Sequence, residues 1–463
     1  MDAALTQATQ DQLRAGQHGL LLIADNNDAF AARALSARSS EHTLDLMYYL
    51  WHDDRTGRLL MREVLAAAER GVRVRMLIDD INPQSSDRVY LSLNSHPNIQ
   101  LRLFNPSGMR NGSLLRGLEL VARMFAMTRR MHTKAWIADG RLAIVGGRNI
   151  GDAYFDAADT NFRDLDVLLL GRGVEETAAI FEAYWNCQAA WPVHRLHPKR
   201  ARRMPVAIEA PEASMETVER LRGKRSIDEF IAAGDVHWIS AARVVADPPE
   251  KVIGARRDNW LTRELLPIIR GSGSSVEIVS PYFIPGRKGL AALVDLIGRG
   301  VDVSVLTNSL AATDVAAVHG AYANYRVALL KAGVKLFELQ PFGGKQRISV
   351  FGSKGASLHT KAFVVDGARG FVGSFNFDPR SASLNAEMGI IFDDVHLAGE
   401  MQRRFRREMG PQTSYRLFLE RNRLRWEGIL DDAVEQFSRE PEAGVYRRLI
   451  AGVIRWLPIE SQL

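Results

Sequence analysis

The chain has little cysteine, little lysine and no long hydrophobic run. Its single cysteine, Cys187, can form neither an intramolecular disulfide nor the cysteine cluster of a zinc or iron–sulfur site. No stretch of about 18 consecutive apolar residues occurs, so no transmembrane helix is expected. Residues 1–19 are polar and lack the apolar core of a signal peptide. We therefore expect any contact with a membrane to be made from its surface.

The remaining composition is that of a large folded protein with a slight basic excess. The 463 residues are 46% hydrophobic and 25% charged, which is enough for two or three domains and excludes wholesale disorder. Basic residues number 60 against 54 acidic ones, and the pI of about 9.4 favours anionic partners. Only ten of the basic residues are lysines. Arginine, which suits phosphate and carboxylate groups, carries most of the positive charge.

Three segments of the chain occur twice in the same order. Residues 70–77 (RGVRVRML) resemble 299–306 (RGVDVSVL), residues 132–135 (HTKA) recur at 359–362, and residues 145–149 (VGGRN) resemble 372–376 (VGSFN). The paired segments are separated by 229, 227 and 227 residues. Nearly constant separations indicate a duplicated domain with small length changes between the copies.

Each copy has the pattern of an α/β domain. Residues 43–49 and 72–78 are typical of strands around a helical pattern at 58–70, and residues 276–280 and 301–306 flank a helical pattern at 290–299. Such alternation predicts βαβ units and a sheet covered on both faces. Gly71 and Gly300 follow the two helices as C-terminal stop signals.

The repeat also sets the expected domain boundaries. We predict a first lobe at residues 1–191, a linker rich in Pro, Arg and His at 192–216, and a second lobe at 217–396. Residues 397–463 form an extension with no upstream counterpart. The extension has a helical pattern and is strongly basic, so a basic helical C-terminal extension is expected.

Each copy contains one histidine motif of the form His-x-Lys followed, after four residues, by Asp. The first consists of His132, Lys134 and Asp139, and the second of His359, Lys361 and Asp366. One interpretation is a pair of structural histidines at edge strands, but lysines at identical offsets are not a core pattern. On a strand, each histidine and its lysine point to the same face, because side chains alternate with period two.

The residue types in these motifs suit chemistry at a phosphate. A neutral imidazole can attack phosphorus, while an ammonium group offsets the charge of the phosphate oxygens. If the two strands come together, one histidine can be the nucleophile and the other, protonated, can donate to the departing alkoxide. No metal or other cofactor is expected, since lysines can supply the positive charge and ligand spacings such as H-E-x-x-H are absent.

The paired motifs resemble those of the phospholipase D superfamily. The resemblance includes residues 146–149 and 373–376 after each motif, and the run 374–381 (SFNFDPRS) with 385–387 (NAE) is close to the second motif of bacterial cardiolipin synthases. More narrowly, residues 307–315 (TNSLAATDV), 129–132 (RRMH) and 457–460 (LPIE) resemble the C-type cardiolipin synthases, which lack N-terminal transmembrane helices. The similarity runs from about residue 21 to the C-terminus. One departure is Gly147, which stands where the second copy has Ser374.

The resemblance implies two duplicated α/β/α sandwich lobes with the active site at their interface. It implies that His132 or His359 forms a covalent phosphohistidine; we favour His132, with His359 as acid and then base. The phosphate oxygens would be held by Lys134, Lys361, Asn149, Asn376 and Ser374. Asp164 and Glu387 match the family's acidic residues and would orient an active-site imidazole, as a buried carboxylate does in a triad. Asp139 and Asp366 belong to the signature and are expected to be structural or turn residues.

The same catalytic pair serves lipid transferases, phospholipases and nucleases, so the fold does not choose the substrate. Two segments favour lipid. Residues 114–125 mix apolar residues with arginines just ahead of His132, and residues 446–457 place apolar residues on one helical face and arginines on the other. Either segment could instead be an ordinary packed helix. Residues 195–203 are basic but lie in the expected linker, and no recognised nucleic-acid module appears. A catalytically dead binding protein is disfavoured, because both copies keep His and Lys.

We therefore expect a metal-independent phosphatidyltransferase that forms cardiolipin, with hydrolytic phospholipase D as the alternative and a nuclease as a weaker one. The expected partners are phosphatidylglycerol, phosphatidylethanolamine as a second candidate donor, and the membrane surface, with no nucleic acid. The expected location is peripheral, on the bacterial cytoplasmic membrane. The phosphatidyl donor, the membrane face and the oligomeric state are left open by the sequence.

Overall fold

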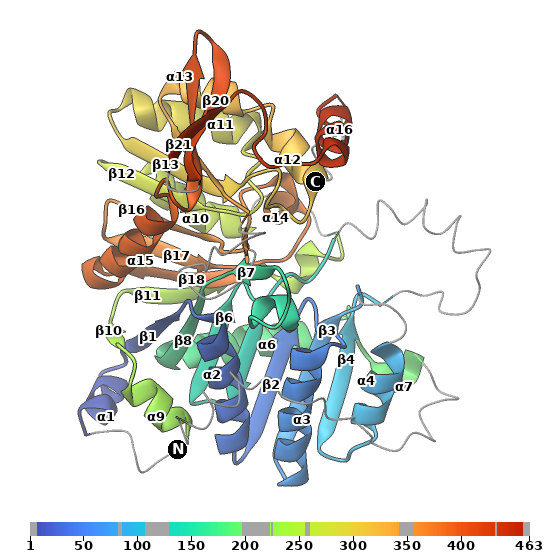
Figure 1. Ribbon diagram of the computed structural model, residues 1–463. Coiled ribbons are helices and arrows are strands. Elements are labelled where there is room, and N and C mark those ends of the chain that lie inside the picture. Colours follow the sequence, from blue (N-terminus) through green and yellow to red (C-terminus); the bar gives the residue numbers. More distant parts are fainter. Residues whose placement is uncertain are drawn as a thin grey trace, which may run out of the picture. The chain divides into compact units, whose positions relative to one another are not determined.

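The computed structural model describes residues 7–81, 86–106, 129–196, 223, 226–254, 260–341, 356–430 and 433–456 (Figure 1). The chain forms two compact units. The first comprises Met1–Ala158, Leu165–Asp258 and Leu384–Ile390, and the second comprises Asp159–Asp164, Asn259–Ser383 and Ile391–Leu463. Each unit thus takes one short segment from the part of the sequence that otherwise builds the other. We call Asp159–Asp164 and Leu384–Ile390 the exchanged segments.

The first unit is built on a mixed sheet with the strand order β10-β1-β8-β6-β5-β2-β3-β4-β9. The central strands β2, β3 and β4 are parallel, while β5, β6 and β8 are antiparallel to their neighbours. The residues of β2, β5 and β6 are buried almost without interruption, as expected of strands covered on both faces. The strands are β1 (His18–Ile23), β2 (Thr43–Tyr48), β3 (Arg73–Asp79), β4 (Ile99–Phe104), β5 (Ala135–Ala138), β6 (Leu142–Gly146), β8 (Asp166–Gly171), β9 (Ala190–Pro192) and β10 (His237–Ile239), with β11 (Ala242–Ala246) following.

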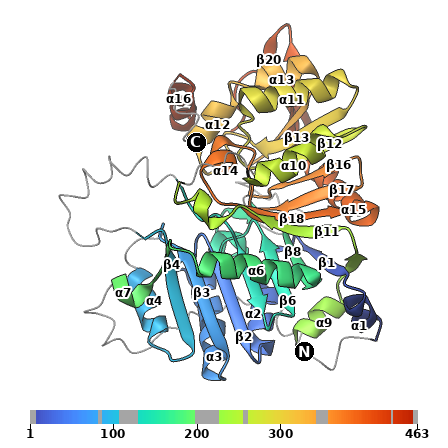
Figure 2. The same cartoon turned by 180° about the vertical axis from the view of Figure 1, so that it is seen from behind.

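Helices α2 and α3 cover one face of this sheet and α6 covers the other (Figures 1 and 2). Helix α2 begins where the Asp25 carboxylate accepts hydrogen bonds from the backbone N–H groups of Asn27 and Asp28, and α3 begins at a similar cap on Asp54. The helices of this unit are α1 (Gln7–Arg14), α2 (Asn26–Ser39), α3 (Arg55–Glu69), α4 (Ser86–Asn94), η1 (Asp152–Tyr154), α6 (Arg172–Trp185), α7 (Val193–Leu196), α9 (Ile227–Ala232) and η2 (Pro249–Lys251).

The second unit repeats this plan. Its strands run in the order β18-β17-β16-β12-β13-β14-β19-β20-β21, with β12, β13 and β14 parallel. The strands are β12 (Ser275–Val279), β13 (Asp302–Asn308), β14 (Lys335–Leu339), β16 (Ala362–Val365), β17 (Arg369–Gly373), β18 (Met388–Asp393), β19 (Ser414–Glu420), β20 (Arg423–Leu430) and β21 (Ala433–Phe437). A separate two-stranded sheet joins β7 (Asn161–Arg163) to β15 (Ala356–Leu358) in parallel.

The helices of the second unit also follow the first. Helix α11 lies between β12 and β13 in the chain, as α3 lies between β2 and β3, and α15 packs on β12, β16 and β17. These helices are α10 (Trp260–Arg270), α11 (Gly286–Gly298), α12 (Ala316–Tyr322), α13 (Arg326–Ala332), α14 (Pro379–Ser383), α15 (Val395–Glu408) and α16 (Val445–Ile454). The duplicated α/β architecture predicted from the repeats is confirmed. Gly71 and Gly300 have φ values of +100° and +83°, which explains why glycine ends the two equivalent helices.

The C-terminal extension is only partly helical, contrary to the prediction for residues 397–463. It begins within α15 and ends with α16, but β19, β20 and β21 lie between them and extend the sheet of the second unit. Strands β19 and β20 form a hairpin whose two loop residues, Arg421 and Asn422, have φ values of +49° and +63°. Positive φ at both positions is the geometry of a tight hairpin turn.

Three predictions concern residues outside the described ranges: the apolar stretch at 114–125, most of the expected linker at 192–216, and the ending at 457–460. Among the helices that are described, none combines the length and the hydrophobicity that crossing a membrane requires.

Candidate active site

The His-x-Lys motifs lie in extended backbone immediately before a strand of each unit. His132 and Lys134 precede β5, and His359 and Lys361 lie between β15 and β16. The prediction that the motif residues sit on a strand is therefore wrong by a few residues. The backbone of the second motif still pairs with strands, because the Gly373 N–H at the end of β17 donates to the Lys361 carbonyl at 3.1 Å.

In the first unit, His132 is paired with Glu387. The imidazole Nδ1 lies 2.7 Å from Glu387 Oε2, and both side chains are buried. Glu387 belongs to the exchanged segment Leu384–Ile390, which lies beside the motif: the His132 N–H donates to the Ala386 carbonyl at 2.8 Å, and the Ala386 N–H donates to the Arg130 carbonyl at 2.9 Å. The backbone pairing fixes the carboxylate against the ring.

A second buried carboxylate, that of Asp247, fixes the exchanged segment Leu384–Ile390. Asp247 Oδ2 accepts a hydrogen bond from the Glu387 N–H at 2.9 Å and another from Lys251 Nζ at 2.8 Å. The Asp247 N–H donates in turn to the Glu387 carbonyl at 2.8 Å, and the Tyr184 hydroxyl donates to the Asp247 carbonyl at 2.6 Å. Asp247 therefore fixes the position of Glu387 by bonding to both its backbone N–H and its backbone carbonyl.

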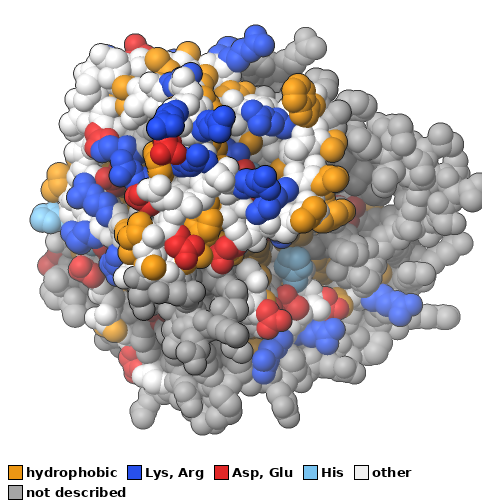
Figure 3. Space-filling model, turned by 45° about the horizontal axis from the view of Figure 1, so that its top comes forward, with side chains coloured by type: hydrophobic (Ala, Val, Ile, Leu, Met, Phe, Trp, Pro, Cys, Tyr) orange, Lys and Arg blue, Asp and Glu red, His pale blue; other side chains and the backbone are white. Residues whose placement is uncertain are grey.

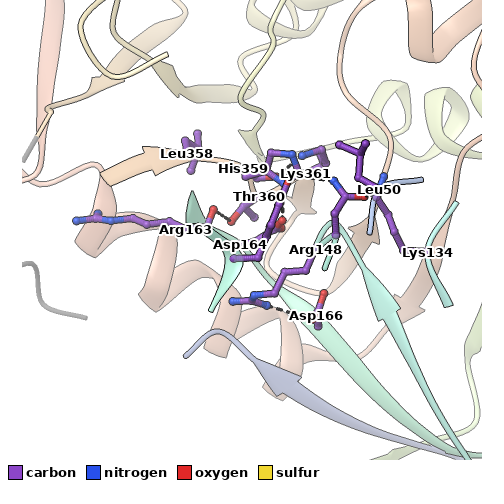
Figure 4. A network of polar contacts seen from close by, with 12 residues as sticks. Leu50, Lys134, Arg148, Arg163, Asp164, Asp166, Leu358, His359, Thr360 and Lys361 are labelled. Carbon is purple, nitrogen blue, oxygen red and sulfur yellow. Dashed lines mark hydrogen bonds and ion pairs between the residues drawn. The ribbon is translucent and has the colours of Figure 1, made fainter. Parts of the chain in front are cut away.

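In the second unit, the matching pair is His359 with Asp164. The imidazole Nδ1 lies 2.5 Å from Asp164 Oδ2, and Asp164 belongs to the exchanged segment Asp159–Asp164 (Figure 4). The Arg163 carbonyl accepts from the N–H groups of His359 and Thr360 at 2.7 and 3.0 Å and from the Thr360 hydroxyl at 3.2 Å. The two pairs thus have the same construction. Each histidine takes its carboxylate from the segment that follows the motif of the other sequence copy.

These pairs define which ring nitrogen is available for chemistry. An ionised carboxylate accepts only, so a neutral imidazole beside it carries its proton on Nδ1 and its lone pair on Nε2. The lone pair on Nε2 is what a nucleophile or a general base requires, and the buried carboxylate stabilises the imidazolium that forms when the ring takes up a proton. With Nδ1 paired to a carboxylate, Nε2 of each histidine can therefore act as a nucleophile or as a general base.

Both motif lysines are buried and fold back on their own histidine. Lys134 Nζ donates to the His132 carbonyl at 2.7 Å, and Lys361 Nζ donates to the His359 carbonyl. Lys134 Nζ also lies 5.3 Å from the centre of the Tyr49 ring. An ammonium group has three N–H donors, so a bond to the carbonyl is compatible with a further bond to a phosphate oxygen.

One aromatic ring packs on each imidazole, which the sequence did not predict. Tyr49, just after β2, meets His132 edge-on with ring centres 4.9 Å apart, and Phe162 on β7 lies 4.9 Å from His359. An aromatic wall restricts rotation of the imidazole and keeps water from one side of it. These residues lie outside the repeated motifs, so the pattern that revealed the histidines carried no signal for them.

One buried asparagine follows each motif: Asn149 comes shortly after β6, and Asn376 comes shortly after β17. Asn149 Oδ1 accepts from the Leu50 N–H at 3.3 Å, and its Nδ2 donates to the Tyr154 hydroxyl at 2.8 Å. In the second unit the Asn376 N–H donates to the Ser381 hydroxyl at 3.2 Å, while Asn376 Oδ1 is buried with no hydrogen-bond partner among the described residues. Ser374 is fully buried. The side chain of Asn149 therefore has hydrogen-bond partners for both its oxygen and its nitrogen, whereas the side-chain oxygen of Asn376 has none among the described residues.

Asp139 and Asp366 bind backbone amides at the start of the neighbouring strand. Asp139 accepts from the N–H groups of residues 41–43, and Asp366 accepts from those of residues 273–275 and from the Ser272 hydroxyl. Burial alone would raise the pKa of the Asp366 carboxyl, but the backbone donors of Gly273 and Ser275 and the hydroxyl of Ser272 hold it well below its usual range. This geometry supports the structural role expected for the third motif residue.

We expect Asp366→Asn to destabilise the protein by about 1–3 kcal/mol at neutral pH, because the amide leaves several donors poorly paired. Since the folded-state pKa of Asp366 is lowered, its contribution is fully present above the ordinary carboxyl pKa of about 4 and is lost as the pH falls toward the folded-state value. Urea midpoints should therefore differ between variant and parent at about pH 7, and the difference should shrink progressively as the pH falls below about 4. Asp393→Asn, at an exposed carboxylate on β18, is the control, and an equal effect from it would contradict the assignment.

Two further polar residues position the motifs. Asp79, at the end of β3, accepts from the Met131 N–H at 2.9 Å and from Arg130 Nη1 at 3.1 Å, and burial raises the pKa of Asp79 to about 7 against the pull of that guanidinium. In the second unit Asn308 forms two hydrogen bonds to the backbone of Leu358, at 2.8 and 2.9 Å, next to His359. Asn308 lies in the segment 307–315 that resembles the C-type cardiolipin synthases, and its contacts show that it fixes the backbone just before His359.

The chain is similar to known proteins over most of its length. Residues 36–185 and 265–409 match the family described as "Cardiolipin synthase, PLD-like domain". The chain is 40% identical to cardiolipin synthase C of Escherichia coli over 96% of both chains. It is 26% identical to a cardiolipin synthase of Listeria monocytogenes, over 83% of this chain and 67% of that one. Among solved structures, phosphatidylserine synthase of Haemophilus influenzae has the same fold, with a TM-score of 0.63, 12% identity and coverage of 99% of this chain and all of that one.

Proposed function

We propose that this chain, which belongs to the cardiolipin synthases with phospholipase D-like domains, transfers a phosphatidyl group from one phospholipid to a hydroxyl of phosphatidylglycerol and so forms cardiolipin. The observation that carries the proposal is the repeated site: in each unit a histidine, its buried carboxylate and its lysine have the same construction. Nearly full-length similarity to a cardiolipin synthase supports this substrate class.

The proposed reaction has two displacements at phosphorus. His132 Nε2 attacks the phosphodiester, an N–P bond forms, and the bond from phosphorus to the headgroup oxygen breaks while His359, as imidazolium, gives its proton to that oxygen. A hydroxyl of phosphatidylglycerol then attacks phosphorus, its proton passes to neutral His359, and the N–P bond breaks. Two in-line displacements retain the configuration at phosphorus.

The remaining site residues supply charge and position. Lys134 and Lys361 offset the negative charge that gathers on the phosphate oxygens, and Asn149, Asn376 and Ser374 hold those oxygens. Glu387 and Asp164 keep Nε2 of each histidine directed at phosphorus and stabilise the imidazolium state. Asp139 and Asp366, the last residues of the two motifs, support the neighbouring strands.

The substrates place the enzyme at a membrane surface. We propose that it is peripheral on the bacterial cytoplasmic membrane, with phosphatidylglycerol as acceptor and either phosphatidylglycerol or phosphatidylethanolamine as phosphatidyl donor. Transfer to an alcohol requires that water be kept from the phosphohistidine. A hydrolytic phospholipase D would use the same residues and differ only in the acceptor.

The product of the reaction decides between these activities. Purified protein is incubated with vesicles containing labelled phosphatidylglycerol, with and without phosphatidylethanolamine, and the lipids are separated. Cardiolipin is the expected labelled product, and which mixture yields it identifies the donor. Phosphatidic acid without cardiolipin would assign hydrolysis instead, and cleavage of single-stranded DNA at a comparable rate would assign a nuclease. The His132→Ala protein serves as the blank.

A further inference from the structure

The last described helix, α16, is attached to the second unit by one face. Its Ala451 packs against α12 so closely that a Cβ at Gly320 would lie 2.7 Å from the Ala451 carbonyl oxygen. Arg447 Nη1 donates to the carbonyls of Leu310 and Thr313 at 3.1 and 2.5 Å. The helix is therefore seated on the fold by small residues and by an arginine that binds backbone.

The segment that leads into α16 is also firmly tied. Buried Arg326 pairs with Glu440 at 2.6 Å, and the Tyr415 hydroxyl donates to Glu442 at 2.6 Å. Arg326 pairs in addition with buried Glu338 at 3.2 Å. A buried arginine shared by two carboxylates fixes where this segment runs, so the helix that follows is presented in a defined orientation on its own unit.

The opposite face of α16 is apolar and exposed. Five side chains are between 54% and 87% exposed: Val445, Tyr446, Leu449 and Val453 on α16, and Trp456 in the turn directly after it. At 3.6 residues per turn they occupy an arc of roughly 100°. They are five of the twelve large hydrophobic side chains that are exposed among the described residues, and the other seven are spread over separate elements. Figure 3 shows hydrophobic side chains gathered at the right-hand edge of the coloured surface, beside Lys and Arg side chains.

Two exposed arginines border this arc on one side. Arg448 and Arg455 follow the apolar residues around the helix and remain exposed, although Arg448 also donates to the Glu440 carbonyl and Arg455 to Asn324. A surface helix with an apolar stripe, a tryptophan and a tyrosine within it, and arginines along its border is the pattern that binds at the interface of an anionic bilayer. Aromatic side chains with one polar group prefer the headgroup level.

We infer that α16 is the element by which the enzyme docks on an anionic phospholipid bilayer, with Leu449, Val453 and Trp456 entering the interfacial region and Arg448 and Arg455 meeting lipid phosphates. This inference rests on the proposed function, because that function requires the protein to take its substrates from a bilayer. The inference adds the surface through which the protein binds the bilayer. The docking face lies on the side of α16 away from the fold, so it can meet lipid without unfolding any described contact.

The test uses the full chain with Leu449→Glu and Val453→Glu combined. Cosedimentation with vesicles of phosphatidylglycerol and phosphatidylcholine should show affinity lowered by at least about tenfold, since two apolar side chains are replaced by carboxylates that an anionic surface repels. The matched control combines Val294→Glu on α11 with Val395→Glu on α15, which are also exposed helical valines. The control should bind vesicles as the parent does. Brominated lipids should quench the parent's fluorescence more than that of Trp456→Phe.

Three results would overturn the inference: unchanged sedimentation of the double variant, an equal loss in the control, or a parent dimer that the double variant dissociates while vesicle binding persists. The last would assign the face to a second copy of the chain. Turnover of dihexanoyl-phosphatidylglycerol, dissolved below its micelle concentration, separates this test from the proposed function. That turnover should be the same in parent and variant. Its absence from both would count against the proposed function, while sedimentation would still decide the role of α16.

Discussion

Replacing either motif histidine by alanine should abolish phosphatidyl transfer, with kcat/KM falling by at least about 10⁴-fold. In the proposed mechanism, His132→Ala removes the group that forms the N–P bond, and His359→Ala removes the proton donor for the first displacement and the base for the second. Production of cardiolipin from labelled phosphatidylglycerol measures both effects. His396→Ala, at an exposed histidine on α15, is the control and should leave the rate unchanged. Substantial activity in either motif variant would contradict the two-histidine mechanism.

A substrate with a p-nitrophenyl leaving group separates the two roles. This leaving group departs without protonation, so His359→Ala should still release p-nitrophenolate once per enzyme and then stop at the phosphohistidine, because no base activates the acceptor. His132→Ala should show no such burst. The reverse pattern would exchange the roles of the histidines. Mass spectrometry of the stalled protein would locate the phosphorylated residue directly.

Replacing the paired carboxylates by amides should have the second largest effect, lowering kcat by about 10²- to 10⁴-fold with little change in KM. In Glu387→Gln and Asp164→Asn the shape of each side chain is kept, but an amide can donate to Nδ1 and so favours the tautomer with the proton on Nε2. The imidazolium also loses its counter-charge. Glu435→Gln, at an exposed position on β21, is the control, and thermal unfolding of all variants shows whether the fold is retained.

The structure predicts which variant affects which step. Glu387 contacts His132 and Asp164 contacts His359. With the p-nitrophenyl substrate, Glu387→Gln should therefore slow the burst, whereas Asp164→Asn should leave the burst fast and slow the turnover that follows. If Asp164→Asn slowed the burst and Glu387→Gln did not, the assignment of carboxylates to histidines would fail, although both residues would remain important for activity.

The duplicated α/β fold and the motif residues could be predicted from the sequence, because a repeat at a constant separation is a local pattern that survives without knowledge of packing. The pairing of Glu387 with His132 and of Asp164 with His359 could not. Each acidic residue follows the motif of its own copy, and only the path of the exchanged segments shows which imidazole it meets. The rings of Tyr49 and Phe162 were missed for the same reason, since their contacts join residues far apart in the chain.

The basic charge and hydrophobic content of the extension do not reveal its three strands, whereas the period of its side chains does. In β19 the buried side chains Tyr415 and Leu417 alternate with exposed Arg416, which is a strand pattern. The loop pair Arg421–Asn422 is compatible with a two-residue hairpin. The helical pattern predicted for the extension is confirmed in α15 and α16, which lie on either side of these strands in the chain.

The exchanged segments have a consequence for how such a protein could have arisen. A precursor holding a single copy of the motif would have carried both a histidine and an acidic residue, yet in the arrangement seen here each acidic residue serves the histidine of the other copy. Such a precursor could complete its histidine–carboxylate pairs only as a homodimer that traded these strands reciprocally. Gene fusion would then have joined the two exchanging copies in one chain. Cutting the present gene between the copies should leave two inactive halves that regain function only when they are produced together.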